Sequence, residues 1–234
     1  MRSYQKIFVL LILIVQIFTC KTTSKRHIYF PLAPYEEAVC RSGYPTKSIA
    51  YPTEFYAKTF VTDTRLYKNI IIGDSTMDIS RKYKNFISEN TQNVAVSGNT
   101  FCDMIEQTPA ILTPNPQNII ISSAGGNDAI QKKTPDAIIS TGKTLISRLR
   151  SRFPGSKIIL VGIHPTKLDY VNIIRNTINR ALEKVVDCYV DPDEYFHIQL
   201  NGEPLESELI DKIHYSKDMS FQIKEGILKC GADI

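Results

Sequence analysis

The sequence predicts an α/β protein in which a mostly parallel sheet of about five strands is covered by helices on both faces. Short apolar runs that end in Gly or small polar residues are typical of strands buried on both faces. Several of the segments between them carry apolar residues at helical spacing, and this alternation favours a parallel sheet. The 234 residues are 43% hydrophobic and 22% charged, which is ordinary for one globular domain. Such a composition excludes a collagen, a low-complexity disordered chain and a multi-span membrane protein.

Four of the predicted strands are short apolar runs, and the fifth is less well defined. The four runs are residues 69–72, 94–96, 118–122 and 157–161. Gly73 follows the first of them and Gly162 follows the last. The fifth strand lies within residues 185–190 or within residues 195–200, and the sequence leaves both open.

Helical periodicity is clearest in two segments. Ile138, Leu145, Leu149 and Phe153 share one face of a segment that stops at Pro154-Gly155. Apolar residues spaced three and four apart predict a long amphipathic helix over residues 168–185. In parallel sheets ligands bind at the carboxyl ends of the strands, so the functional residues are expected there.

The charge of the chain is nearly balanced. Its 28 Lys and Arg residues against 24 Asp and Glu residues give a net charge of +4. No run of Lys or Arg is long enough to suggest binding to nucleic acid, so we expect no nucleic-acid partner.

The first twenty residues differ from the rest of the chain. Arg2 and Lys6 precede an apolar run over residues 7–18, which has the length of a signal-peptide core and is short for a membrane-spanning helix. The run closes on Cys20 and resembles a bacterial lipoprotein signal, in which the cysteine becomes the lipidated N-terminus. We therefore expect residues 1–20 to be a signal peptide and Cys20 to be lipidated. The alternatives are ordinary secretion with cleavage near this point and an uncleaved anchor.

The expected export predicts a location for the protein, and the sequence beyond residue 20 divides into an arm and a domain. We expect a protein anchored to the membrane at the cell envelope, in the periplasm or at the surface. Residues 21–66 are rich in Tyr and Pro and are interpreted as an irregular N-terminal arm. Residues 67–234 are interpreted as the folded domain.

Four cysteines lie beyond Cys20. In an exported protein they permit two disulfides, and four cysteines allow three connectivities, which the sequence leaves open. No CxxC pair is present, so a structural zinc site is not expected. The four are Cys40, Cys102, Cys188 and Cys230.

The first motif, Gly73-Asp74-Ser75, comes directly after the first predicted strand. Gly73 permits a tight turn, and Ser75 would begin the next helix with its hydroxyl exposed. Backbone N–H groups at a helix N-terminus also favour developing negative charge. The alternative is a structural N-cap, because Asp and Ser are common there.

The second motif, Gly125-Gly126-Asn127-Asp128, follows the third predicted strand. The Asn127 amide could donate a hydrogen bond to an oxyanion across the strand ends. The alternative is a Gly-rich turn with Asn127 in a left-handed conformation and Asp128 capping the next helix.

The third motif is Asp211-Lys212-Ile213-His214 near the C-terminus. A spacing of three lets a carboxylate hold one imidazole nitrogen while the other faces a nucleophile. The alternative is an exposed turn. His164 follows the fourth predicted strand and could line the same edge of the sheet, although a packed loop residue is the simpler interpretation.

Together the motifs carry more information than each one alone. A Ser after the first strand, a Gly after the second, Gly-x-Asn-Asp after the third and Asp-x-x-His near the end resemble the SGNH hydrolases, also called GDSL esterases. The matching positions are Gly73–Ser75, Gly98, Gly125–Asp128 and Asp211–His214, within residues 68–230. Thr76 stands where the family name has Leu.

The resemblance implies a fold, a site and a chemistry. The family has a three-layer α/β/α sandwich around a mostly parallel, flavodoxin-like sheet. Its pattern makes Ser75 the nucleophile, His214 the general base and Asp211 the residue that orients His214. The oxyanion hole would consist of the backbone N–H groups of Ser75 and Gly98 and the side-chain amide of Asn127. No metal and no organic cofactor is expected.

These expectations combine into one predicted function. The protein would be an exported serine ester hydrolase that cleaves carboxylic esters through an acyl-serine intermediate. Its substrate would be an ester of a glycan, carrying a short acyl or acetyl group, or a lipid ester. One alternative is an O-acyltransferase that modifies surface polysaccharide with the same triad, and another is a surface binding protein without catalysis.

Overall fold

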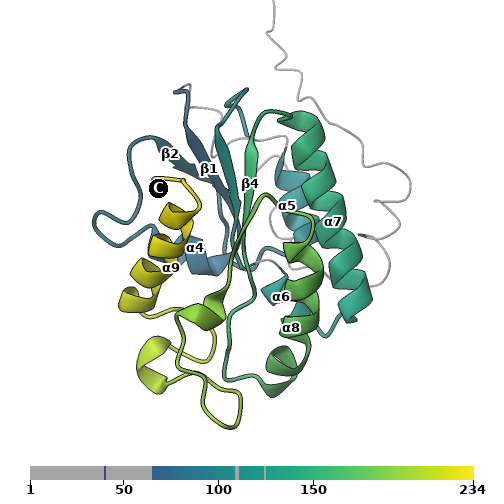
Figure 1. Ribbon diagram of the computed structural model, residues 1–234, viewed down its shortest axis with the longest axis vertical. Helices are drawn as coiled ribbons and strands as arrows, with labels where there is room; N and C mark the ends of the chain where they lie inside the picture. The colour runs from purple at the N-terminus through teal and green to yellow at the C-terminus, as the bar shows by residue number, and fades with distance from the viewer. Residues whose placement is uncertain (1–39, 41–64, 109–110, 124) are drawn as a thin grey trace, which may run out of the picture. The chain divides into compact units, whose positions relative to one another are not determined.

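The computed structural model contains a five-stranded, all-parallel sheet with helices on both faces (Figure 1). It describes Cys40 and residues 65–108, 111–123 and 125–234. The strand order is β2-β1-β3-β4-β5, the flavodoxin-like order, and it confirms the predicted fold class. The strands are β1 Asn69–Ile72, β2 Thr91–Asn93, β3 Asn118–Ile121, β4 Lys157–Val161 and β5 Cys188–Val190.

Two hydrophobic cores, one on each face of the sheet, make the three layers. Successive residues of a strand point to opposite faces, so Ile70 and Ile72 enter one core while Ile71 enters the other. Helices α5, α6, α7 and α8 cover the first face, and α4 and α9 cover the second (Figure 1). Their bounds are α4 Ser75–Ser80, α5 Phe101–Gln107, α6 Gly126–Ile130, α7 Pro135–Arg152, α8 Asp169–Glu183 and α9 Lys217–Lys229. Two short 3₁₀ helices, η3 Pro192–Glu194 and η4 Glu206–Glu208, lie between β5 and α9.

Both helices with clear periodicity are present. Helix α7 starts after Thr134, whose side chain accepts a hydrogen bond from the Ala137 N–H, and it ends at Arg152, just before the Pro154-Gly155 stop. Helix α8 begins at Asp169 and buries Val171, Ile178 and Leu182, all of which lie on the predicted apolar face. No helix in the described part of the chain has both the length and the apolar character needed to cross a bilayer.

The second strand is not where the apolar run predicts it. Strand β2 is Thr91–Asn93, and residues 94–96 follow it. The N–H groups of Val94 and Val96 still donate to the carbonyls of Ile71 (2.9 Å) and Gly73 (3.1 Å), while the Ala95 N–H donates to the side-chain oxygen of Asn93 (2.9 Å). The prediction failed because β2 is a polar edge strand, so the apolar residues mark its continuation and not the strand itself. The fifth strand, β5, lies within the first of its two candidate segments.

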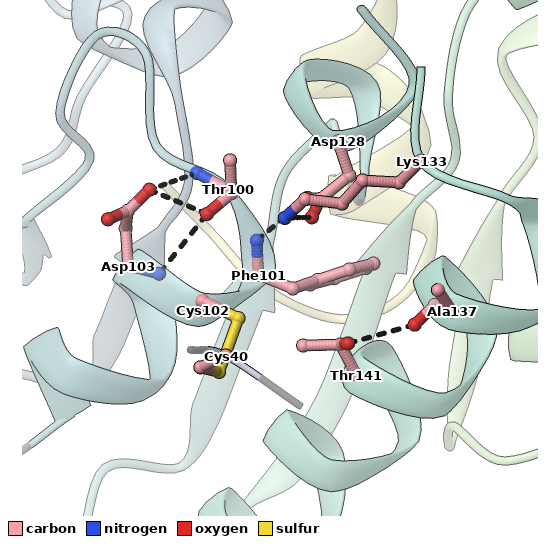
Figure 2. The surroundings of a disulfide bond; sticks show 9 residues. All are labelled: Cys40, Thr100, Phe101, Cys102, Asp103, Asp128, Lys133, Ala137 and Thr141. Carbon is pink, nitrogen blue, oxygen red and sulfur yellow. Dashed lines mark hydrogen bonds and ion pairs between the residues drawn. A yellow bond between two sulfur atoms is a disulfide. The ribbon is translucent and has the colours of Figure 1, made fainter. Parts of the chain in front are cut away.

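Two disulfides join distant parts of the chain. Cys188 in β5 bonds Cys230 at the end of α9, and Cys40 bonds Cys102 in α5 (Figure 2). This is one of the three connectivities that the sequence allowed. The predicted signal peptide, Cys20 and the rest of the predicted arm up to residue 64 lie outside the described residues.

Candidate active site

The turn between β1 and α4 places Ser75 at the carboxyl end of a central strand. Gly73 lies so close to β3 that a Cβ atom there would be 3.1 Å from the Cβ of Ser122. Asp74 is the N-cap of α4, and one of its carboxylate oxygens accepts hydrogen bonds from the N–H (2.9 Å) and the hydroxyl (2.8 Å) of Thr76. Because Asp74 caps the helix, the Ser75 hydroxyl is left for another partner.

That partner is His214, which comes from the far end of the chain. The Nε2 atom of His214 lies 2.8 Å from the Ser75 Oγ, and its Nδ1 atom lies 2.6 Å from the Oδ2 of Asp211. A carboxylate only accepts hydrogen bonds, so Nδ1 carries the proton and Nε2 accepts from the serine hydroxyl. The structure therefore brings Ser75, His214 and Asp211 together in the order that their predicted roles require.

The Asp211 carboxylate accepts hydrogen bonds from the backbone as well as from the His214 imidazole. Its Oδ1 atom accepts hydrogen bonds from the backbone N–H groups of Ile213 (2.7 Å) and His214 (2.8 Å). Partial burial raises the pKa of Asp211, but the hydrogen bonds from the His214 side chain and from these two N–H groups outweigh it, and the net pKa is lowered. The carboxyl is thus ionised at neutral pH, as its predicted orienting role requires.

The residues predicted to form the oxyanion hole lie in the segments that follow the first three strands: Ser75 begins α4, Gly98 lies on the loop after β2, and Asn127 is in α6. Gly98 has a φ of 89°, a left-handed conformation that favours glycine. Among the described residues, the backbone N–H groups of Ser75 and Gly98 donate no hydrogen bond. The absence of a protein acceptor within the described part of the chain is consistent with their predicted role.

The third predicted donor, Asn127, is already engaged. Its amide nitrogen lies 2.9 Å from the Asn99 carbonyl and 3.2 Å from the Oδ2 of Asp74. The Asn99 side chain in turn donates to the Gly73 carbonyl (3.0 Å). These hydrogen bonds connect the segments that follow β1, β2 and β3. An oxyanion would have to replace one acceptor of the Asn127 amide. The sequence motifs did not include Asn99. Only its position next to Gly98 could have indicated that it contacts the site.

Asp74 is unusual among the carboxyl groups near the site. Burial raises its pKa to about 6, against the hydrogen bonds from Thr76 and Ser123 and the charge of His214, which lower it. A carboxyl with this pKa, hydrogen-bonded to Asn127, titrates just below neutral pH. The sequence predicted only a helix N-cap at this position.

Asp128, next to Asn127, has a structural role. It is fully buried, and its carboxylate accepts hydrogen bonds from the Phe101 N–H (2.8 Å) and from the Lys133 ammonium (2.7 Å) (Figure 2). Through the first bond it fixes the start of α5, beside the Cys102 disulfide. Of the two adjacent residues, Asn127 thus lies at the site, whereas Asp128 stabilises the fold.

A family model, the GDSL-like Lipase/Acylhydrolase family, matches residues 71–219. The chain belongs to the GDSL-like lipase and acylhydrolase family. The match contains all of the predicted catalytic and oxyanion-hole residues, from Ser75 to His214, and it confirms the resemblance inferred from the motifs. Family membership supports an ester hydrolase in general.

Solved structures share the GDSL fold at low sequence identity. A platelet activating factor protein from Streptococcus pneumonia is 16% identical, with a TM-score of 0.66 over 76% of this chain and 90% of that one. A GDSL-like lipase from Bacteroides thetaiotaomicron is 15% identical, with a TM-score of 0.61 over 76% and 96%. An acetylxylan esterase from Geobacillus stearothermophilus is 16% identical, with a TM-score of 0.50 over 70% and 93%. No curated protein sequence matches the chain.

No group of three or more His, Cys, Asp or Glu side chains suited to a metal ion occurs among the residues that the structure describes. The acidic side chains of the site instead contact protein donors. Asp74 accepts from Thr76 and Asn127, and Asp211 accepts from His214.

Proposed function

We propose that this GDSL family member is a serine ester hydrolase that cleaves carboxylic esters through an acyl-serine intermediate on Ser75. The observation that supports it most directly is the 2.8 Å contact between Ser75 Oγ and His214 Nε2, with His214 Nδ1 2.6 Å from Asp211. A serine hydroxyl is a poor nucleophile at neutral pH unless a base removes its proton, and His214 lies in the position to do so.

In the first half of the reaction, Ser75 Oγ bonds to the ester carbonyl carbon while its proton passes to His214 Nε2. The tetrahedral oxyanion would accept hydrogen bonds from the N–H groups of Ser75 and Gly98 and from the Asn127 amide. The bond to the leaving alcohol then breaks, and that oxygen takes the proton from His214. Asp211 stabilises the imidazolium that exists between the two proton transfers.

In the second half, water attacks the acyl-serine. His214 removes a proton from the water and returns it to Ser75 Oγ when the second tetrahedral intermediate collapses. The products are the carboxylic acid and the free enzyme, and no redox change occurs. We propose a short acyl or acetyl ester of a glycan, or a lipid ester, as the substrate, in line with the acetylxylan esterase and the lipase among the structural neighbours.

The test is hydrolysis of p-nitrophenyl esters from acetate to long acyl chains by the full chain. We expect Ser75→Ala and His214→Ala each to lower kcat by at least about 10⁴-fold. Ser88→Ala is the matched control, because Ser88 precedes β2, at the opposite end of the sheet, and hydrogen-bonds to Thr91. Wild-type activity in folded Ser75→Ala protein would refute the proposal. Acyl transfer to an added sugar in preference to water would instead favour the O-acyltransferase.

We also propose that the protein is exported and anchored to the cell envelope through a lipid on Cys20. The apolar run that closes on this cysteine supports the proposal, and paired cysteines are typical of exported proteins. Intact-mass measurement of the native protein should give a chain that starts at Cys20 and carries the added mass of a lipid. An unmodified chain that starts beyond Cys20 would refute the anchor.

A further inference from the structure

The segment Asp211–His214 contains the peptide groups Lys212–Ile213 and Ile213–His214. In both of them the N–H and the carbonyl oxygen are hydrogen-bonded. The N–H groups of Ile213 and His214 both donate to Asp211, as described above. The carbonyls of the same two peptide groups belong to Lys212 and Ile213, and they point toward a different part of the chain.

Both carbonyls are bound by the loop between β4 and α8, residues 162–168. The backbone N–H of Lys167 donates to the Lys212 carbonyl (2.8 Å). The Nε2 atom of His164 lies 2.5 Å from the Ile213 carbonyl oxygen. The peptide that enters His214 is therefore held by Asp211 at its N–H and by His164 at its carbonyl.

The protonation of His164 follows from this contact. A carbonyl oxygen only accepts hydrogen bonds, so the His164 Nε2 atom carries a proton. Burial lowers the pKa of His164 to about 4, with Arg175 and His214 acting in the same direction, against the raising effects of the Ile213 carbonyl and Asp211. The ring is thus a neutral donor at neutral pH. Its Nδ1 atom has no hydrogen-bond partner among the described residues.

The position of His164 is itself fixed by packing. The side chain is 2% exposed and lies between Phe196 and Tyr215, with ring centroids 5.8 and 4.4 Å away. The loop is anchored on α8, where Asn179 binds both the N–H (2.8 Å) and the carbonyl (2.9 Å) of Ile163. His164 therefore projects from a rigid support toward the segment that carries the base.

We propose that His164 is a positioning residue for His214. Its Nε2–H fixes the plane of the Ile213–His214 peptide, and so keeps the His214 imidazole within hydrogen-bond distance of Ser75 Oγ. This inference depends on the proposed function of Ser75 and His214. A displacement of about 1 Å at a reacting group can lower the rate by about 10²-fold, so a small shift of this peptide has a measurable effect.

The test separates the hydrogen bond from the aromatic ring. His164→Phe keeps the ring and removes the donor, while His164→Gln keeps a donor close to the position of Nε2 and removes the ring. Thr166→Val is the matched control: Thr166 is a buried residue of the same loop, and its hydroxyl accepts from the Leu168 N–H (3.1 Å). Each full-length variant is assayed below its melting temperature with p-nitrophenyl acetate, and with diethyl p-nitrophenyl phosphate as a probe of Ser75 reactivity.

We expect His164→Phe to lower kcat and the rate of Ser75 phosphorylation by about 10- to 100-fold, with KM changed by less than about threefold. His164→Gln should recover kcat to within about fivefold of wild type, and Thr166→Val should leave kcat unchanged while lowering stability. If His164→Phe does not fold, His164→Asn replaces it. The Asn amide is one methylene too short to reach Ile213, so kcat should be about tenfold below that of the Gln variant.

Two results would overturn the inference. One is a wild-type kcat in folded His164→Phe protein. The other is an equal loss of kcat in the Phe and Gln variants, which would assign the effect to packing. Ser75→Ala and His214→Ala are assayed beside them. Activity in those variants would refute the proposed function, whereas their inactivity together with an unaffected His164→Phe variant would refute only the role of His164.

Discussion

Ser75 and His214 lie 2.8 Å apart at their reacting atoms, yet the structure supports them in opposite ways. Ser75 is 9% exposed and begins a helix directly after β1, which pairs with strands on both sides. The His214 side chain is 23% exposed and the Asp211 side chain that contacts it is 51% exposed, and both belong to an irregular segment between η4 and α9. The proposed nucleophile is thus placed by regular structure, and the proposed base by individual hydrogen bonds.

The difference predicts where substitutions act. Around Ser75 a change disturbs packing, so it should lower stability first. Around Asp211 most of the segment is solvated, and a change should lower the catalytic rate while the fold persists.

The largest effect is expected at Asp211. In Asp211→Asn the remaining amide oxygen can still accept the N–H groups of Ile213 and His214, but the amide nitrogen would face the Nδ1–H of His214 and favour the wrong tautomer. We expect kcat to fall by about 10³- to 10⁴-fold, with little change in KM or melting temperature. A large fall in melting temperature would show that the segment is as tightly coupled to the core as the β1–α4 turn.

The disulfide between Cys188 and Cys230 should matter for stability and little for rate. It closes a loop with a sequence separation of 42 that contains the entire Asp211–His214 segment. Replacing both cysteines by serine should lower the free energy of unfolding by about 4 kcal/mol, measured by denaturant titration. We expect kcat below the melting temperature to stay within about twofold, and a larger loss would mean that the disulfide also positions the base.

On the buried side, Gly125→Ala should destabilise the protein directly. Gly125 has a φ of 91°, and a Cβ atom there would lie 2.7 Å from Ile138 and 2.9 Å from Phe101. We expect a loss of about 2–4 kcal/mol in the free energy of unfolding. Gly202 is the matched control, because it also has a positive φ but a Cβ there meets nothing within 4 Å, so Gly202→Ala should cost only about 1 kcal/mol. Equal losses would show that backbone strain, not packing, dominates.

The smallest effect is the pH dependence of stability contributed by Asp74. Its pKa is raised from 3.8 to about 6 by burial, so the folded state binds a proton that the unfolded state releases between these values. Stability from this group is therefore present at low pH and is lost as pH rises through about 6. The difference in unfolding free energy, wild type minus Asp74→Asn, should fall by roughly 2–3 kcal/mol between pH 4 and 7.

His164 should show the opposite sign. Its pKa is lowered from 6.5 to about 4, so the unfolded state binds more protons, and stability from this group is lost as pH falls from about 6.5 toward 4. The difference between wild type and His164→Phe should therefore rise with pH over the same interval. Parallel slopes for Asp74 and His164 would contradict one of the two assignments.

Much of the fold was predictable from local pattern. Strands β1, β3 and β4 are central and buried on both faces, so their sequences are continuous apolar runs. The polar residues that follow them collect at one edge of the sheet because all of the strands are parallel. The prediction placed the second strand at residues 94–96 and not at Thr91–Asn93, because an edge strand needs no apolar run.

The proximity of the candidate site residues was predictable in the same way. The candidate residues Ser75, Gly98 and Asn127 and the Asp211–His214 spacing could be recognised in the sequence, because each predicted role needs a particular residue type after a strand or in a turn. The hydrogen bond from the Asn127 amide to Asp74 could not be predicted. Asp74 is 53 residues away, and its carboxylate reaches the amide only after β1 and β3 pair.

The sequence by itself thus determined the fold class, the family and the chemical groups of the site, because these depend on residue type and on spacing within single elements. Only the tertiary structure decided the disulfide pairing, the engagement of Asn127 and the contact between His164 and Ile213. The physical reason is the same in each case. A buried donor or thiol takes whichever partner the packed fold brings within reach, and residues 49 positions apart meet only when β4 and the last segment of the chain are in place.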